Sequence, residues 1–203
     1  QLGGKAVTAS DSNGYVYDEA GISLEKLAFL KDLKNNRRGR IKEYAERFSG
    51  VVYQSITTTD DYNPLWTIPA DCAFPCATQN EINEKDAHNL VNNKIKLLCE
   101  GANMPVTISG INVLIDNGIL YAPGKASNAG GVATSGLEMT QNYMGMHWTS
   151  EKVDSTLQDI MKHIHDTSLV TAKEYNKPRN YMVGANIAGF LKVARAMQAQ
   201  GVI

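Results

Sequence analysis

The chain has 203 residues, of which 43% are hydrophobic and 20% charged, and its formal net charge is -1 at pH 7. This composition is typical of globular proteins and supplies enough apolar residues for a substantial core. The near-neutral charge argues against a nucleic-acid partner. No apolar run approaches the roughly 20 residues that a membrane helix needs, so no membrane partner is expected either.

Two short strands and two helices are predicted in the first part of the chain. A β-prone run at residues 5–10 ends in the turn residues 11–14, and a second short strand is expected at 51–54. Ser23 can cap a helix, and a second helix is predicted at 41–48. The apolar stripe of the first helix would consist of Leu24, Leu27, Leu30 and Leu33.

The break between these two helices is basic. It carries Arg37, Arg38, Arg40 and Lys42. Two interpretations are open: the cluster forms a solvated elbow between the helices, or it binds a phosphate. Residues 57–69 follow as a polar, proline-bounded loop, with Trp66 expected to be buried beneath it.

Short apolar strands then alternate with helices. The expected strands are 71–76, 95–99 and 119–122, and the expected helices are 83–91, 107–116, 131–146, one from Thr149 onward, and 181–200. Continuously apolar strands that alternate with helices are typical of a parallel sheet covered on both faces. The predicted fold class is α/β, with a Rossmann-like, mostly parallel sheet and flanking helices, followed by an all-helical C-terminal segment.

The three cysteines lie in this apolar part of the chain. They are Cys72, Cys76 and Cys99. Because their number is odd and their surroundings are strand-like, we interpret them as buried free thiols in a reducing cytoplasm. No quartet of histidines and cysteines accompanies them, so no metal site is predicted.

Polar or small residues follow four of the predicted strands. They are Asp11-Ser12, Thr78-Gln79-Asn80, Ala102-Asn103 and Asn128. Ligands of open α/β sheets bind beyond the carboxyl ends of the strands. The alternative, that each turn merely caps the next helix, explains any one of these turns better than all four. The pattern therefore predicts a ligand site at this edge.

Asn128, the fourth turn, lies in a glycine-rich stretch at residues 124–139. This stretch starts as a loop and becomes a helix. Gly130 and Gly131 allow a backbone to approach a ligand closely. The unpaired amides of a helix start suit carboxylates and phosphates. Asn128 and Ser135 add an amide and a hydroxyl, so this stretch is the strongest candidate for ligand binding.

The residues alone leave the choice of dinucleotide open. No Gly-x-Gly-x-x-Gly run is present. Asp11 follows a strand at the place where such folds hold the adenosine ribose, and its carboxylate would repel a 2′-phosphate, which favours NAD. Arg37, Arg38 or Arg40 could fold back and neutralise that phosphate, which favours NADP.

Several sequence strings, in order along the chain, resemble those of hexameric bacterial glutamate dehydrogenases. They are CATQNEI at 76–82, EGANMP at 100–105 and NAGGVATSGLEM at 128–139, together with residues 4–14 and 184–190. Leucine and phenylalanine dehydrogenases share the Asn-Ala-Gly-Gly-Val element. The other strings and the hydroxyl of Ser135, which suits a distal carboxylate, are more similar to the glutamate enzymes.

This resemblance implies reversible oxidative deamination of L-glutamate to 2-oxoglutarate and ammonia by a hexamer. Ser135 would contact the side-chain carboxylate, Val132 would line the pocket, and Asn128 would contact the α-end of the substrate or the nicotinamide. The implied cofactor-binding residues are Thr78, Gln79, Asn80, Ala102 and Asn103, with Ser10, Asp11 and Ser12 at the adenosine ribose. Ser-Asp-Ser resembles the NADP-linked members, so NADP is expected, with NAD as the alternative.

The resemblance also predicts the domain organisation. Residues 1–130 would form a partial dinucleotide-binding domain without its first strand and glycine-rich turn, so neighbouring strands should have unpaired edges. Residues 131–203 would form C-terminal helices that return to a catalytic domain. The catalytic lysines and aspartate of the family lie in that N-terminal domain, so no catalytic residue is expected here and the chain alone should be inactive. Two alternatives are a stand-alone nucleotide-binding or assembly module and a related aliphatic amino-acid dehydrogenase.

Overall fold

The structure is a computed structural model that describes residues 3–57 and 61–201. Residues 1–2 and 202–203, and residues 58–60 of the predicted 57–69 loop, therefore lie outside the described residues. The chain divides into two compact units, one formed by residues 1–70 and 85–94 and the other by residues 71–84 and 95–203. Each unit is described by itself.

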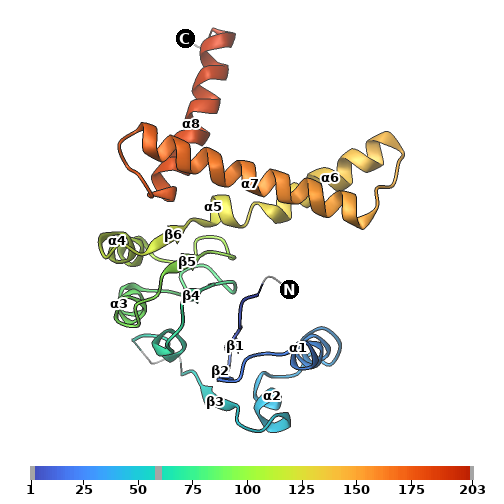
Figure 1. Cartoon of the computed structure of the whole chain (residues 1–203), viewed down its shortest axis with the longest axis vertical. Helices are drawn as coiled ribbons and strands as arrows, with labels where there is room; N and C mark the ends of the chain where they lie inside the picture. Colours follow the sequence, from blue (N-terminus) through green and yellow to red (C-terminus); the bar gives the residue numbers. More distant parts are fainter. Residues whose placement is uncertain (1–2, 58–60, 202–203) are drawn as a thin grey trace. The chain divides into compact units, whose positions relative to one another are not determined.

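The first unit is built on a three-stranded antiparallel sheet (Figure 1). In spatial order its strands are β1 (Thr8–Asp11), β2 (Gly14–Tyr17) and β3 (Val52–Ser55). Asp11 pairs with Gly14, so the two residues between them form a tight hairpin turn. A Cβ at position 14 would lie 2.3 Å from the carbonyl oxygen of Gln54, so only glycine fits between β2 and β3. Strands at 5–10 and 51–54 were predicted, but this antiparallel sheet and β2 were not.

Two helices pack on this sheet around a small core. They are α1 (Leu24–Lys31), which continues into the π-helical turn η1 (Asp32–Asn36), and α2 (Lys42–Arg47). The Oγ of Ser23 accepts a hydrogen bond from the backbone N–H of Lys26 at 3.3 Å, so the predicted cap is confirmed. The buried centre of the core consists of Val16, Leu30, Ile41 and Tyr44.

The predicted leucine stripe is only half right. Leu30 and Leu33 are buried, whereas Leu24 is 76% exposed and Leu27 is 40% exposed. Each three-residue step falls about 60° short of a full helical turn, so four leucines at this spacing sweep half of the helix surface. One buried face cannot take all four.

The rest of the first unit contains the 3₁₀-helix η2 (Pro64–Thr67) and most of α3 (Glu84–Asn92). The carboxylate of Asp86 accepts a hydrogen bond from the backbone N–H of Asn63 at 2.7 Å, and the side chain of Asn93 donates to the carbonyl of Trp66 at 3.1 Å. Trp66 is buried, as predicted for the residue beneath this loop.

The second unit contains the parallel sheet that the sequence predicts (Figure 1). Its strands are β4 (Cys72–Ala73), β5 (Leu97–Cys99) and β6 (Leu120–Ala122), in that spatial order. Helix α4 (Ile108–Asp116) connects β5 to β6, and the Oγ of Thr107 caps it by accepting from Gly110 N at 3.3 Å. The mixed α/β class is thus confirmed.

Strand β4 is much shorter than the predicted strand at 71–76. Pro75 has no N–H to donate to a ladder, and its carbonyl instead accepts hydrogen bonds from the N–H groups of Gly101 and Ala102 at 2.9 and 3.1 Å. The prediction of buried thiols is wrong as well, because Cys72 and Cys76 are exposed and only Cys99 is half-buried. All three are free thiols, and β4 is an edge strand with one side unpaired within this sheet.

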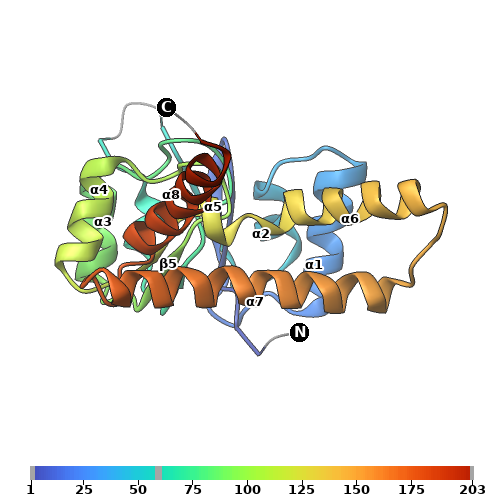
Figure 2. The same cartoon turned by 90° about the horizontal axis from the view of Figure 1, so that it is seen from above.

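The described residues after β6 form four helices and the turns between them. The helices are α5 (Gly124–Ser127), α6 (Gly130–Met144), α7 (Ser150–Glu174) and α8 (Tyr181–Gln200). Figure 2 shows α6 and α7 side by side, and Figure 1 shows α8 crossing the far end of α7 and projecting beyond it. A Cβ at Gly184 would lie 1.9 Å from the carbonyl oxygen of Ser168, so the backbones of α7 and α8 touch at this crossing. None of the helices in the described parts of the chain is both long and apolar enough to cross a membrane.

Candidate functional site

The predicted ribose-binding residues lie at the β1–β2 turn of the first unit. Ser10 and Ser12 are exposed and Asp11 is half-buried. The Oδ2 of Asp11 accepts hydrogen bonds from Lys34 Nζ and from the backbone N–H of Ile41, both at 2.9 Å. Its Oδ1 accepts from the backbone N–H of Asn13 at 3.0 Å. Both carboxylate oxygens are therefore engaged within the protein.

These contacts keep Asp11 ionised. Burial by itself raises the pKa of a carboxyl, but the hydrogen bonds from Ile41, Lys34 and Asn13 and the charge of Lys34 outweigh it, so the pKa of Asp11 is lowered. The negative charge of Asp11 is compensated at short range by Lys34. It therefore presents much less repulsion to an anion than a free carboxylate would.

Two arginines in the basic break between α1 and α2 make different contacts. Arg40 Nη1 donates a hydrogen bond to Ser12 Oγ at 2.9 Å, so this arginine does fold back onto the β1–β2 turn. Arg37 instead forms ion pairs with Asp32 at 2.8 Å and Glu43 at 3.0 Å. We call Ser10, Asp11, Ser12, Lys34 and Arg40 the turn cluster.

In the second unit, three predicted turns meet at the carboxyl ends of the strands. We call their residues the strand-end cluster: Thr78, Gln79, Asn80, Ala102, Asn103 and Asn128. The backbone N–H of Asn80 donates to the carbonyl of Met104 at 3.0 Å, which ties the loop after β4 to the loop after β5. Ala102 and Asn128 are half-buried, and the other members are exposed.

The loop after β4 is closed by Glu81. Its Oε2 accepts from the backbone N–H of Thr78 at 3.1 Å. Burial raises the pKa of Glu81, and the backbone hydrogen bonds from Thr78 and Ala77 offset only part of that rise. Across the cluster, a Cβ at Gly101 would lie 2.4 Å from Cys76 Sγ, so a larger residue there would require the Cys76 side chain to move.

Asn128 connects the third turn to this cluster. Its Nδ2 donates to the carbonyl of Ala102 at 3.2 Å and to Oδ1 of Asn103 at 2.7 Å. Since the amide nitrogen has two hydrogens and both have acceptors, the orientation of the side chain is fixed and Oδ1 remains as an acceptor. Asn128 is thus a fixed hydrogen-bond acceptor at the ends of the strands.

The two predicted substrate-binding residues on α6 are exposed. Val132 is 74% exposed, and the Oγ of Ser135 donates to the carbonyl of Gly131 at 3.4 Å within the helix. They are three residues apart, so they share one face of α6. No described hydrogen bond joins either of them to Asn128, so their role stays a prediction.

The sequence analysis missed Lys34 of the turn cluster and Glu100, which lies next to the strand-end cluster. Lys34 belongs to the helical segment after Leu33, and nothing local distinguishes it from a solvated lysine. Glu100 was interpreted only as part of a turn, although it is 3% exposed and directly follows β5. A charged residue at the carboxyl end of an apolar strand was the available signal.

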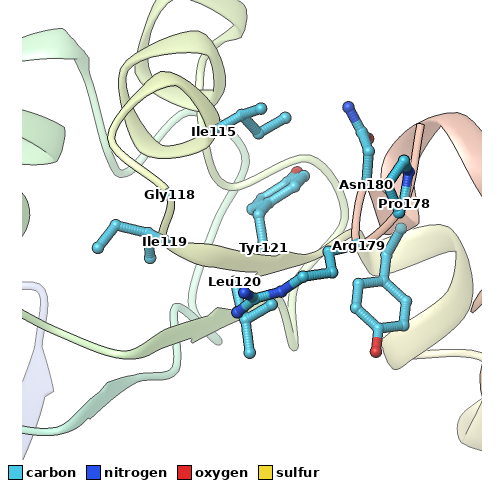
Figure 3. Close-up of a pocket in the computed structure, with 9 residues that line it drawn as sticks. Ile115, Gly118, Ile119, Leu120, Tyr121, Pro178, Arg179 and Asn180 are labelled. Carbon is cyan, nitrogen blue, oxygen red and sulfur yellow. The ribbon is translucent and has the colours of Figure 1, made fainter. Parts of the chain in front are cut away.

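A separate cavity of about 220 Å³ lies beside β6 (Figure 3). Its walls include Ile115, Leu120 and Tyr121 on one side and the segment 178–181 on the other, and Figure 3 shows Arg179 extending along β6 near Leu120. None of the predicted site residues lines it. Among the residues that the structure describes, no group of three or more His, Cys, Asp or Glu side chains is arranged to hold a metal ion.

The chain is similar to known proteins along its whole length. The sequence pattern of the Glutamate/Leucine/Phenylalanine/Valine dehydrogenase family matches residues 1–201. The chain is 55% identical over 202 residues to the NAD(P)-specific glutamate dehydrogenase of Xylanibacter ruminicola, and 52% identical over 206 residues to the NADP-specific glutamate dehydrogenase of Haemophilus influenzae. These matches cover 100% and 99% of this chain, but 44% and 43% of the relatives.

A solved structure gives the same result. The glutamate dehydrogenase of Plasmodium falciparum matches with a TM-score of 0.90 and 48% identity, covering 98% of this chain and 42% of that one. The chain therefore spans less than half the length of the curated relatives and of this structure.

Proposed function

This chain belongs to the Glutamate/Leucine/Phenylalanine/Valine dehydrogenase family, and on that premise we propose that it is the cofactor-binding portion of an NADP-dependent glutamate dehydrogenase. The complete enzyme would convert L-glutamate reversibly to 2-oxoglutarate and ammonia, with NADP supplying or accepting the hydride at its nicotinamide. The residues of this chain would bind and orient the cofactor and part of the substrate. The acid–base groups would come from the remaining length of such an enzyme.

The contact between Arg40 and Ser12 carries the preference for NADP. A guanidinium 2.9 Å from a hydroxyl at the β1–β2 turn offers a cation and a neutral donor to the same phosphate. Asp11, the residue that would otherwise repel a 2′-phosphate, has its charge compensated by Lys34 at 2.9 Å. The donor set of the turn cluster therefore fits a ribose with a 2′-phosphate better than a ribose with two free hydroxyls.

The strand-end cluster would receive the other end of the cofactor and the substrate. Asn128 presents Oδ1 as an acceptor, which suits the amide N–H₂ of nicotinamide or the α-amino group of the substrate. Thr78, Gln79, Asn80, Ala102 and Asn103 would line the path of the dinucleotide. The supporting observation is that hydrogen bonds join the loops that carry them.

Ser135 and Val132 would select the substrate side chain from α6. A hydroxyl at Ser135 can donate to the distal carboxylate of glutamate, whereas Val132 supplies an apolar wall. In the complete enzyme, Ser135→Val should raise KM for 2-oxoglutarate by about 10–100-fold, the loss expected for one hydrogen bond to a charged group. If KM stays unchanged, or if leucine outcompetes glutamate in the unaltered enzyme, the assignment to glutamate is wrong.

Assembly and location follow from the same proposal. We propose that the complete protein acts in the cytoplasm as a homo-hexamer, as the resemblance implies. Residues 1–130 would belong to its Rossmann-like cofactor domain and residues 131–203 to the helices that return to the catalytic domain.

A fluorescence titration of the 203-residue chain with NADPH and, in parallel, NADH tests the proposal. We expect saturable binding that is tighter for NADPH. The same chain should show no turnover with 2-oxoglutarate, ammonium and NADPH, while the complete enzyme should turn over. Binding of neither nucleotide by the chain or by the complete enzyme would contradict the proposed function, and binding by both without turnover by the complete enzyme would favour a nucleotide-binding module.

A further inference from the structure

Glu100 is a buried carboxylate with no role in the function proposed above. It follows β5 and is 3% exposed. Its Oε1 accepts from the hydroxyl of Tyr121 at 2.7 Å, and its Oε2 accepts from the backbone N–H of Gly124 at 2.6 Å. Both partners donate, so each oxygen of the carboxylate accepts one hydrogen bond.

The same residue also holds the short helix α5. The Oγ of Ser127 donates to the backbone carbonyl of Glu100 at 2.6 Å. The backbone N–H of Asn128 in turn donates to the carbonyl of Gly124 at 2.8 Å. Glu100 therefore contacts the first and last residues of α5, Gly124 and Ser127, and Asn128 is tied to the first of them.

Packing at Gly124 leaves this turn little freedom. A Cβ there would lie 2.8 Å from the carbonyl oxygen of Ala102, 3.1 Å from Oε2 of Glu100 and 3.4 Å from Nδ2 of Asn128. The carboxylate, the backbone of Gly124 and the amide of Asn128 thus meet in one corner. A shift of Gly124 away from Glu100 would carry Asn128 with it.

We propose that Glu100 is a positioning residue: through Gly124 it sets the backbone position from which the Asn128 amide reaches the carbonyl of Ala102 and Oδ1 of Asn103. The inference rests on the proposed function only in taking Asn128 as a residue that contacts cofactor or substrate. A buried carboxylate oxygen that loses its hydrogen-bond donor is left desolvated and unpaired, which is unfavourable. The position of Gly124 in which both donors reach Glu100 is therefore strongly favoured over positions in which one donor is withdrawn. Asn128 consequently presents Oδ1 to a ligand before the ligand arrives.

Tyr121 provides a variant that removes one donor and leaves the packing intact. Its ring lines the cavity beside β6 (Figure 3), and only its hydroxyl reaches Glu100. Tyr121→Phe therefore tests the carboxylate without opening a void. Glu100→Gln removes the charge and places an N–H₂ against at least one donor.

The first measurement follows the side-chain amide of Asn128 directly. We expect Glu100→Gln and Tyr121→Phe each to shift the Asn128 side-chain ¹⁵N–¹H resonances, and to accelerate hydrogen exchange at Gly124 N–H by about tenfold or more, the equivalent of one lost hydrogen bond. The matched control is Thr140→Ala, which removes a side chain-to-backbone hydrogen bond on the exposed surface of α6. It should leave both signals unchanged. Unchanged Asn128 and Gly124 signals in Tyr121→Phe would overturn the inference, even if Glu100→Gln fails to fold.

The second measurement is a double-mutant cycle on NADPH binding. Glu100→Gln should weaken binding by about tenfold in the original chain, but by less than about twofold when Asn128 is already replaced by alanine. Equal loss in both backgrounds would mean that Glu100 acts by general stability and not through Asn128. Tyr121→Phe replaces Glu100→Gln in the cycle if the latter does not fold.

The two measurements, of the Asn128 amide signals and of NADPH binding, distinguish failure of this inference from failure of the proposed function. If the unaltered chain and the complete enzyme bind no NADPH, the proposed function fails and the amide signals of Asn128 decide the inference alone. If NADPH binds but those signals do not respond to either variant, the inference fails and the proposed function stands.

Discussion

Asp11 and Asp18 in the first unit and Glu100 in the second are carboxylates that the protein stabilises in different ways. In the first unit, Asp11 accepts from Lys34 at 2.9 Å and Asp18 accepts from Lys26 at 2.6 Å, so each has a cation beside it. In the second unit, Glu100 accepts only from a hydroxyl and a backbone N–H among its described hydrogen bonds. Charge compensates the first kind and local dipoles compensate the second.

This difference matters because the two kinds of compensation would suit different ligands. A lysine or arginine beside a carboxylate also strengthens binding of a phosphate, and its position need not be exact because charge acts over several ångströms. Neutral donors act only over hydrogen-bond distances and with defined angles, so they fix geometry. The turn cluster is thus suited to recognising charge, and the strand-end cluster to orienting a reacting group.

The largest expected effect tests the charged side of this comparison. Arg40→Ala should weaken NADPH binding by about 10–100-fold, the range for losing one hydrogen bond to a charged group, and should leave NADH binding nearly unchanged. Titrations with both nucleotides at several salt concentrations measure it. Arg37→Ala is the control, because Arg37 is already paired with Asp32 and Glu43. Equal losses in the two variants would mean that only the net charge matters.

A smaller effect, a difference of about 1 kcal/mol between two variants, is expected from the two buried tyrosine–carboxylate pairs. Tyr44 donates to Asp18 at 2.6 Å and Tyr121 donates to Glu100 at 2.7 Å. In both cases burial, then the hydrogen bond to the carboxylate, raises the pKa of the tyrosine, so both hydroxyls stay protonated.

Removing each tyrosine hydroxyl should show how much the neighbouring lysine stabilises Asp18 compared with Glu100, which has only neutral donors among its described hydrogen bonds. Tyr121→Phe should lower the free energy of unfolding by about 2–3 kcal/mol and Tyr44→Phe by about 1–2 kcal/mol, since Asp18 keeps Lys26 and Glu100 keeps no cation among its described partners. Urea denaturation of the two variants measures both. A larger loss for Tyr44→Phe would show that the lysine does not compensate Asp18.

The smallest expected effect is a pH dependence of opposite sign at Asp18 in the first unit and Glu81 in the second. Burial raises the pKa of Asp18, but hydrogen bonds from Lys26 and Tyr44 outweigh it, so the pKa falls below the ordinary 3.8. Its stabilisation is present above pH 3.8 and is lost as the pH falls through the lowered pKa. The pKa of Glu81 lies above its ordinary 4.5, mainly because of burial, so its contribution is present below pH 4.5 and is lost as the pH rises through the raised pKa.

Two charge-removing variants separate these contributions. The destabilisation caused by Asp18→Asn should shrink as the pH falls below 3.8, whereas Glu81→Gln should become more favourable relative to the original chain as the pH rises above 4.5. Unfolding free energies measured from about pH 3 to pH 7 test both slopes. Slopes of the same sign would contradict the contrast between the units.

Local features of the fold were predictable from the sequence because their causes are local. Ser23, Thr107 and Thr149 each accept a hydrogen bond from a backbone N–H three residues ahead, as their type and position predict. The spacing along α7 also predicts one inward-facing stripe, made of Val153, Leu157, Ile160, Ile164, Ser168 and Ala172. The first four are half-buried and the last two are buried.

Two kinds of feature were not predicted from the sequence: a short strand, and contacts between residues that are far apart along the chain. The four-residue strand β2 is too short to show a period of two, so the hairpin and its antiparallel sheet were missed. The contact between Ser12 and Arg40 joins residues 28 positions apart, and Asp11 and Lys34 are 23 apart. The meeting of Asn80, Asn103 and Asn128 was anticipated only because parallel strands end at one edge. Which donor faces which acceptor there was not.

The crossing of α7 and α8 at Gly184 has a mechanical consequence. The helices touch through backbone atoms at that point, and α8 then continues with Phe190 and Val193 exposed. From Gly184 the helix extends about 24 Å to its end, so a tilt of about 5° at the crossing would move the far end by about 2 Å. The direction of α8 is therefore set at a single glycine. Any larger residue at position 184 would change the angle between α7 and α8 and so displace the far end of α8.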